Sequence, residues 1–290
     1  MRGIILAGGS GTRLRPITRA VCKQLLPVFD KPMVYYPLST LMLAGIRDVL
    51  VITTPRDQGA FRELLGDGAA WGMRLSYAAQ ERPAGIAEAL ILGEGFLEGG
   101  PCALVLGDNL LFGQGLTEAV TEGAALQEGA LVFGYRVADP ERYGVLVWRG
   151  GALVDVVEKP QLPPSRFAVP GLYFYGPDAP ARARDLRPSG RGELEITDLN
   201  RSYLRDGRLR ARLLGRGIAW LDMGTPENLA AAGAFVQGLQ ERQGLRIGCP
   251  EEVAWRRGWI DDEGMEACAK LQEGTDYARY LRALVAEGRG

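Results

Sequence analysis

Short apolar runs alternate with helix-like segments through the first half of this chain. This alternation restricts the fold classes that the chain can adopt. Residues 34–44 and 88–96 have apolar side chains at helical spacing. Strands that alternate with helices build βαβ units, and runs that are apolar on both faces predict strands covered on each side. We therefore expect an α/β fold: a three-layer, Rossmann-like arrangement around a mostly parallel (mixed) sheet. The predicted strands are 3–7, 48–53, 75–79, 103–107 and 131–135.

The middle of the chain has a different pattern. Predicted strands at 143–149, 152–158 and 171–176 are punctuated by Gly and Pro, which indicates a β-ribbon inserted in or beside the parallel sheet. Pro226 then stands where a first-turn proline belongs, ahead of a predicted helix at 227–240. We expect one domain over residues 1–225 and a small helical C-terminal region over residues 226–290.

Histidine is absent from all 290 residues. Its absence excludes catalytic triads, Cys-His pairs, histidine zinc sites and histidine general bases. Carboxylates, Lys, Arg, Tyr and backbone amides remain, and this set suits hard cations and phosphoryl chemistry. The net charge of -1 and the pI of about 5.8 argue against a nucleic-acid partner. Any basic residue that binds phosphate must therefore act locally.

The four cysteines form no C-x-x-C pair, so neither a zinc ribbon nor a thioredoxin-type motif is present. No export signal precedes the first apolar run, and no stretch approaches the roughly 20 apolar residues of a membrane span. We expect a cytoplasmic protein with reduced thiols and no membrane association.

A glycine-rich turn follows the first predicted strand. Its glycines let successive amides point at phosphate oxygens, and Arg13 adds a fixed cationic fork. The turn is not a P-loop, which requires Gly-Lys-Ser/Thr, nor a dinucleotide fingerprint, which requires glycine at Leu14. A turn that only reverses the chain is the alternative. The turn comprises Gly8, Gly9, Ser10, Gly11, Thr12 and Arg13.

Two aspartates stand at the ends of apolar runs, where open α/β sheets bind ligands. Asp108 follows the run 103–107, and Asp222 follows the run 219–221. Together these two carboxylates can hold one Mg²⁺ with waters and phosphate oxygens. Each aspartate could instead be a turn former or a helix N-cap.

The chain resembles the sugar nucleotidyltransferase (sugar-nucleotide pyrophosphorylase) family over essentially its whole length. Residues 8–16 and 23–27 match the family's opening signature. The class that makes dTDP-glucose, glucose-1-phosphate thymidylyltransferase, is matched by the stretches 31–38, 106–109, 171–175 and 192–198.

The resemblance implies transfer of a thymidylyl group from dTTP to α-D-glucose 1-phosphate, which gives dTDP-glucose and pyrophosphate, the first step of dTDP-deoxysugar (for example dTDP-L-rhamnose) biosynthesis. It also implies Mg²⁺ on Asp108 and Asp222, and a homotetramer inhibited by a deoxysugar nucleotide at a second site between subunits. Trp255, Arg256 and Trp259 would then supply interface, although these tryptophans could equally be core of the tail.

Site residues follow from the same resemblance. Catalytic roles fall to Arg13, Lys23 and Lys159. Nucleotide binding falls to Leu6, Gly8, Gly9, Ser10, Gly11, Thr12, Arg13, Gln24, Gln80, Pro83, Gly85 and Asp108. Sugar-phosphate binding falls to Tyr143, Gly144, Glu158, Lys159, Val169 and Arg191, with Glu193 nearby.

The predicted base pocket departs from the family pattern. Members commonly carry Asp, Leu and Gln at the positions of Ala84, Ile86 and Glu88. The alternatives are therefore a UTP- or CTP-specific glucose-1-phosphate nucleotidyltransferase, or a non-catalytic sensor of sugar nucleotides.

Overall fold

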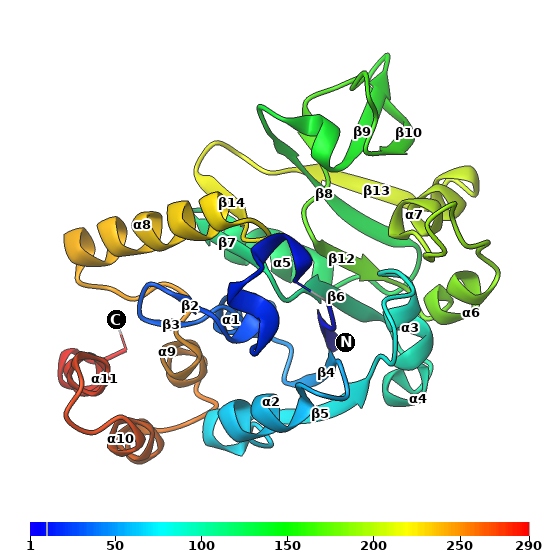
Figure 1. Cartoon of the computed structure of the whole chain (residues 1–290). Coiled ribbons are helices and arrows are strands. Elements are labelled where there is room, and N and C mark those ends of the chain that lie inside the picture. The colour runs from blue at the N-terminus through cyan, green and yellow to red at the C-terminus, as the bar shows by residue number, and fades with distance from the viewer. Residues whose placement is uncertain (10, 290) are drawn as a thin grey trace.

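A computed structural model describes residues 1–9 and 11–289; Ser10, expected in the nucleotide site, lies outside the described residues. At its centre is a 10-stranded mixed sheet with the order β10-β9-β11-β8-β12-β6-β1-β4-β5, and β13 pairs with β8 (Figure 1). The strands are β1 Arg2–Ala7, β4 Asp48–Thr53, β5 Arg74–Ala79, β6 Cys102–Leu106, β8 Ala130–Arg136, β9 Gly144–Arg149, β10 Ala152–Glu158, β11 Phe167–Ala168, β12 Leu172–Tyr175 and β13 Leu209–Leu213.

The half of the sheet formed by β6, β1, β4 and β5 is parallel, as the alternation of strands and helices predicts. Strand β1 pairs in parallel with β4 on one side and with β6 on the other. The ribbon expected in the middle of the chain consists of β9 and β10. Strand β12, by contrast, lies inside the main sheet, antiparallel between β6 and β8. The mixed sheet is therefore confirmed, and its antiparallel pairings all involve strands from the middle of the chain.

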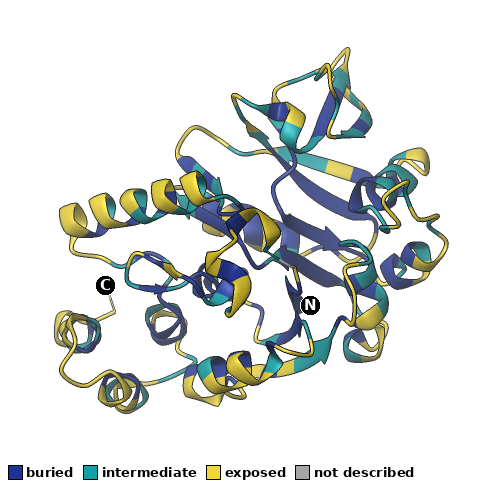
Figure 2. Cartoon of the chain, in the orientation of Figure 1, coloured by how far each residue is buried: buried dark blue, intermediate teal, exposed yellow. Residues whose placement is uncertain are grey.

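Helices cover both faces of the sheet. Strand side chains alternate between two apolar cores, with Ile5 and Val51 in one and Ile4 and Leu50 in the other. The strands at the centre are buried on both sides, and exposed residues lie on the outer helices and the ribbon (Figure 2). The first core contains side chains of α1 Tyr35–Leu43, α2 Gln58–Leu65 and α5 Leu116–Ala124, and the second those of α3 Glu88–Leu92, α6 Ala179–Arg184 and α7 Ile196–Arg205.

The helix predicted at 88–96 is broken. Helix α3 ends at Leu92, and α4 Glu94–Leu97 begins after Gly93. A Cβ at Gly93 would lie 2.7 Å from Cδ1 of Ile4, so a glycine there lets the helix pack directly on β1. Periodicity alone did not reveal this break.

Two small sheets lie beside the main one. Strand β7 Asn109–Gly113 pairs antiparallel with β14 Ile218–Asp222, and β2 Pro27–Val28 pairs with β3 Lys31–Pro32. In the first pair Asp222 lies opposite Asn109. Pairing between these distant segments therefore brings Asp222 next to Asp108.

The C-terminal helices pack against the α/β body (Figure 1). Thr225 caps α8 by accepting a hydrogen bond from Asn228 N (3.3 Å). Trp255 is 1% exposed within the core that contains α1, so it is a core residue rather than a free interface side chain. Trp259 is half-buried beneath the Arg47 guanidinium. These helices are α8 Pro226–Gln243, α9 Pro250–Arg256, α10 Asp262–Leu271 and α11 Asp276–Glu287.

No helix within residues 1–9 and 11–289 combines the length and apolar character needed to cross a membrane.

The buried thiols give the protein a predictable response to high pH. Burial raises the pKa of the Cys102 thiol from 9.0 to about 12. Above about pH 9 the unfolded chain loses that proton while the folded chain keeps it, so the free energy of unfolding falls as pH rises. Urea titrations between about pH 8 and 10.5 should show wild type losing stability relative to Cys102→Ala. A difference that stays constant with pH would contradict a buried, protonated thiol.

Candidate active site

A crevice lies at the carboxyl ends of β1 and β6, where α/β sheets bind ligands. Its volume is about 620 Å³. Asp108 and Asp222 both line it, together with the residues that follow the ribbon strand β10. The sequence-predicted residues that line it are Leu6, Gly9, Thr12, Arg13, Lys23, Gln24, Asp108, Tyr143, Gly144, Glu158, Lys159, Val169, Arg191 and Asp222.

The glycine turn after β1 forms one wall of the crevice. Gly11 is in the left-handed region (φ 59°), and its carbonyl accepts a hydrogen bond from the Thr18 hydroxyl (2.7 Å). Arg13 extends across the crevice, since a Cβ on Gly224 would lie 2.6 Å from an Arg13 guanidinium nitrogen. The turn therefore brings its cationic side chain to the loop that follows Asp222.

Asp108 and Lys23 form an ion pair at the centre of the crevice. Asp108 is 7% exposed, and its Oδ1 also accepts from Asn109 Nδ2 (3.2 Å). Burial acts to raise the pKa of Asp108, but the Lys23 ammonium and these hydrogen bonds outweigh it and lower the pKa below its ordinary value. Asp108 is therefore ionised at neutral pH.

Asp222 lies near enough to Asp108 for their charges to interact. Burial and the negative charge of Asp108 raise the pKa of Asp222, while Arg13, Lys23 and Arg142 oppose that rise. The Arg142 guanidinium approaches Asp222 Oδ2 at 3.7 Å. Two hard oxygen ligands that repel each other form a site that a divalent cation would stabilise.

A metal here would be held by few protein groups. Among the described residues, no cluster of three or more His, Cys, Asp or Glu side chains is placed to hold an ion. Asp108 and Asp222 would therefore share it with water and substrate oxygens, as suits Mg²⁺, which keeps several such ligands.

The sugar side of the crevice follows β10. Glu158 ends that strand, and its carboxylate accepts a hydrogen bond from the Thr197 hydroxyl (2.5 Å). Lys159 takes a left-handed conformation (φ 40°), and its Nζ lies 3.2 Å from Glu158 Oε1. Arg191 reaches Glu195 at 2.8 Å. On this side of the crevice, Lys159 and Arg191 therefore lie near the Glu158 carboxylate, which the Thr197 hydroxyl orients.

The predicted base-reading residues lie behind the glycine turn, outside the lining of the crevice. Gln80 is 5% exposed, and its Nε2 donates to Glu88 Oε2 (2.6 Å) and to the Gly85 carbonyl (3.4 Å). A Cβ at Gly8 would lie 2.8 Å from Gln80 Oε1. Pro83 is exposed. Neither Gly8 nor Gly11 lines the crevice directly. These two residues, predicted to bind nucleotide, belong to the turn that forms the crevice wall but do not face the cavity.

Gly85 is a position where a side chain should be costly. Its φ is 108°, and a Cβ there would lie 2.3 Å from the Leu194 carbonyl oxygen. Because backbone cannot yield to that clash, Gly85→Ala should displace the 84–87 loop and raise KM for dTTP roughly tenfold. The control is Gly59→Ala, since no atom lies within 4 Å of a Cβ there. Equal KM values for both variants would mean that this loop does not contact nucleotide.

Sequence reasoning missed several residues of the crevice. Asn109 links three segments: its Oδ1 accepts from Gly171 N (3.0 Å) and Trp220 Nε1 (2.6 Å), and its amide donates to Asp108. Its position directly after Asp108 was the available signal. Arg142 also lines the crevice, but its approach to Asp222 depends on tertiary contact alone.

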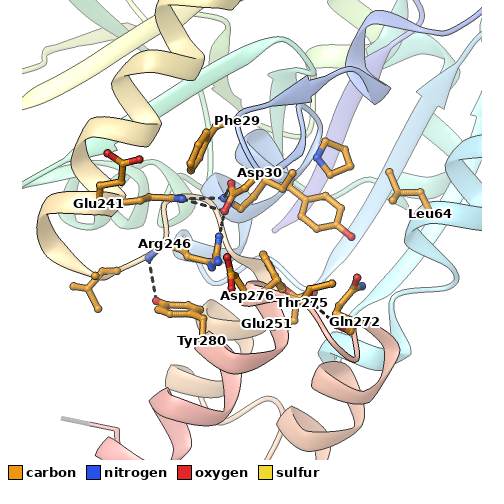
Figure 3. Close-up of a pocket in the computed structure, with 17 residues that line it drawn as sticks. Phe29, Asp30, Leu64, Glu241, Arg246, Glu251, Gln272, Thr275, Asp276 and Tyr280 are labelled. Carbon is orange, nitrogen blue, oxygen red and sulfur yellow. Dashed lines mark hydrogen bonds and ion pairs between the residues drawn. The ribbon is translucent and has the colours of Figure 1, made fainter.

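A larger cavity of about 730 Å³ lies between the β2–β3 hairpin and the C-terminal helices (Figure 3). There Asp30 is paired with Lys31 and Arg246, and Tyr280 accepts from Arg246 N (3.1 Å). Its charged groups are mostly engaged with one another, and it contains neither the glycine turn nor the strand-end aspartates. The chemistry of phosphate and metal binding points to the smaller crevice.

A fold with this glycine turn and paired strand-end carboxylates is that of a nucleotidyl transferase. The family model for nucleotidyl transferases matches residues 2–238, a span that contains the whole crevice.

The chain belongs, within that family, to the glucose-1-phosphate thymidylyltransferases. It is 56% identical to the enzyme of that name from Neisseria gonorrhoeae, over 99% of this chain and 100% of the relative. The Mycobacterium tuberculosis protein of the same name is 52% identical, over 98% of this chain and 99% of the relative. A crystal structure of a Bacillus anthracis protein described by that name, with bound sucrose, superposes with a TM-score of 0.76 at 39% identity, over 81% of this chain and 94% of that chain.

Proposed function

We propose that the crevice transfers a thymidylyl group from dTTP to α-D-glucose 1-phosphate and releases pyrophosphate, with residues 1–225 carrying the reaction. The observation that carries this proposal is that one cavity brings together cations and carboxylates from distant segments: Arg13, Lys23, Arg142, Lys159 and Arg191 line it together with Asp108, Asp222, Glu158, Glu193 and Glu195. Relatives 52% to 56% identical over nearly the full chain bear the name of this activity. The product, dTDP-glucose, is a precursor of dTDP-deoxysugars.

The reaction requires no general base. The attacking oxygen of glucose 1-phosphate is already an anion, so it can attack the α-phosphorus in line as pyrophosphate departs. Lys159 would hold the attacking phosphate, and Glu158 would accept hydrogen bonds from the sugar hydroxyls. Arg13, Lys23 and the turn amides would gather the triphosphate. The absence of histidine from the sequence agrees with this chemistry.

Mg²⁺ is the cofactor that the carboxylate pair would hold, on Asp108 and Asp222. When bound it neutralises charge that builds up on the phosphates. Lys23 keeps Asp108 ionised, and the charges of Arg13, Lys23 and Arg142 limit the rise in the Asp222 pKa, so both carboxylates are available as ligands.

Selection of thymine would depend on Gln80. Its amide carries both a donor and an acceptor, which suits the imide edge of thymine or uracil. Glu88 is an acceptor and holds the Gln80 NH₂ group, so Oε1 is left to accept from the base. An acceptor at this position can bind the N3–H of thymine or uracil.

The decisive experiment measures pyrophosphate release with glucose 1-phosphate and dTTP, UTP or CTP, with and without Mg²⁺. We expect the highest kcat/KM with dTTP and no turnover after chelation of the metal. A higher kcat/KM with UTP or CTP would favour the alternative nucleotide specificity. Binding of dTDP-glucose with no pyrophosphate release from any triphosphate would instead indicate a sugar-nucleotide sensor.

We propose further that the protein is a cytoplasmic homotetramer. Its four cysteines are free and buried, which suits a reducing compartment. Exposed apolar side chains, such as Val154 on β10, Leu162 in the loop after β10 and Leu271 at the end of α10, are available for subunit contact. Sedimentation equilibrium tests the subunit number, and a monomer would contradict it.

A further inference from the structure

A second pocket adjoins the catalytic crevice and shares Gly9 with it. Its volume is about 440 Å³, and its other walls are the 15–19 segment and the 54–57 loop. Strands β1 and β4 are parallel neighbours in which Ala7 pairs with Thr53. The pocket therefore lies just beyond the carboxyl ends of two adjacent strands, the edge at which α/β sheets bind ligands.

The side chains of this pocket are strongly cationic. Arg15, Arg19 and Arg56 line it, against the single carboxylate of Asp57. Among the described residues, only Arg56 of these three forms an ion pair, with Asp57 (Nε–Oδ1 2.9 Å). Within residues 1–9 and 11–289, neither Arg15 nor Arg19 has a carboxylate at ion-pair distance, so both guanidinium groups can pair with an external anion.

Arg56 is held in place before any ligand arrives. Asp57 is 7% exposed and accepts from Arg56 Nε (2.9 Å), from another Arg56 guanidinium nitrogen (3.2 Å) and from the Thr54 hydroxyl (2.6 Å). A further Arg56 nitrogen donates to the Arg19 carbonyl (3.5 Å). These contacts tie the two walls of the pocket together, and a fixed guanidinium loses little freedom when it binds phosphate.

We propose that this pocket binds the two terminal phosphates of the nucleoside triphosphate, which leave as pyrophosphate. The inference rests on the proposed function of the neighbouring crevice. Gly9 lines both spaces, and a Cβ there would lie 3.7 Å from Lys23 Nζ. A triphosphate with its α-phosphate near Lys23 can therefore extend its terminal phosphates past Gly9 to the three arginines.

This placement gives the arginines a role in the reaction. A sugar-phosphate oxygen forms a bond to the α-phosphorus, and the bond from that phosphorus to the bridging oxygen breaks. The bonding electron pair stays on the bridging oxygen, so negative charge increases on the departing pyrophosphate. Guanidinium groups already in position stabilise that charge as it develops.

The test measures four KM values, because only two of the four reactants contain the terminal phosphates. In Arg15→Ala and Arg19→Ala, KM for dTTP and, in the reverse reaction, KM for pyrophosphate should each rise roughly tenfold. KM for glucose 1-phosphate and for dTDP-glucose should not change. Arg19→Lys should recover part of the loss. The control is Arg242→Ala on the exposed face of α8, which should leave all four values unchanged.

Direct binding separates this inference from the proposed function. Calorimetry with inorganic pyrophosphate and Mg²⁺ should show weaker binding to the Arg15→Ala/Arg19→Ala double variant than to wild type, whether or not turnover occurs. Unchanged pyrophosphate binding by a folded double variant would overturn the proposal. So would weaker pyrophosphate binding with an unchanged KM for dTTP, or an equal rise in all four KM values. If wild type released no pyrophosphate from any triphosphate, the proposed function would fail instead.

Discussion

Asp108→Asn should lower kcat for dTDP-glucose formation by about 10²- to 10³-fold. The substitution keeps the size of the side chain but removes the charge that pairs with Lys23 and that would bind Mg²⁺. It should also raise the Mg²⁺ concentration needed for half-maximal rate, because Asp222 would be left as the single carboxylate ligand. Initial rates at saturating dTTP across a Mg²⁺ titration measure both effects.

The matched control for this variant is Asp185→Asn, which makes the same chemical change at an exposed residue after α6. It should retain wild-type kcat and Mg²⁺ dependence. Circular dichroism would show whether Asp108→Asn is folded. A folded Asp108→Asn with kcat within threefold of wild type would remove Asp108 from the proposed metal site.

Lys23→Ala should lower kcat by about 10²-fold and also destabilise the protein. Lys23 and Asp108 side chains are only 13% and 10% exposed, so loss of the ammonium leaves a buried carboxylate without its cation. We expect the free energy of unfolding to fall by about 3 kcal/mol. Urea denaturation and steady-state rates measure the two effects separately.

The double variant Lys23→Ala/Asp108→Asn separates the effect on activity from the effect on stability. Removal of both charges should restore most of the lost stability, because no unpaired carboxylate remains, but activity should stay low. Lys270→Ala serves as the control, since Lys270 is exposed on α10. If the double variant were no more stable than Lys23→Ala alone, the ion pair would not be what stabilises this region.

Local sequence patterns predicted the strands and helices in which apolar residues recur with a clear period. The strands expected at 48–53 and 152–158 coincide with β4 and β10, and the first-turn position of Pro226 in α8 is confirmed. Apolar periodicity and proline geometry act over a few residues, so they can be read without tertiary structure. The break at Gly93 was missed because apolar periodicity continues across it; the space for a side chain there is limited by Ile4, more than eighty residues away in the chain.

Some features of the candidate site could likewise be predicted from the sequence, and others depend on tertiary contacts. The glycine turn, the aspartates at strand ends and the lack of histidine are local or compositional features, and they point to metal-assisted phosphoryl transfer. Gln80 was expected to contact the nucleotide base, and this stays a prediction; the structure adds that its Nε2 donates to Glu88 and that its Oε1 lies beside Gly8. No spacing rule in one sequence predicts such a contact, because it depends on how the 84–87 loop packs against Leu194.

Local patterns in the sequence indicated the alternation of strands and helices in the first half of the chain, the glycine-rich turn and the kind of chemistry that the side chains can perform. The tertiary structure determined which of the predicted site residues line the same crevice. Asp108 lies close enough to Asp222 to help raise the pKa of Asp222 because β14 pairs with β7, segments separated by more than one hundred residues. Long-range strand pairing is determined by the packing of the whole chain, so it has no local signature.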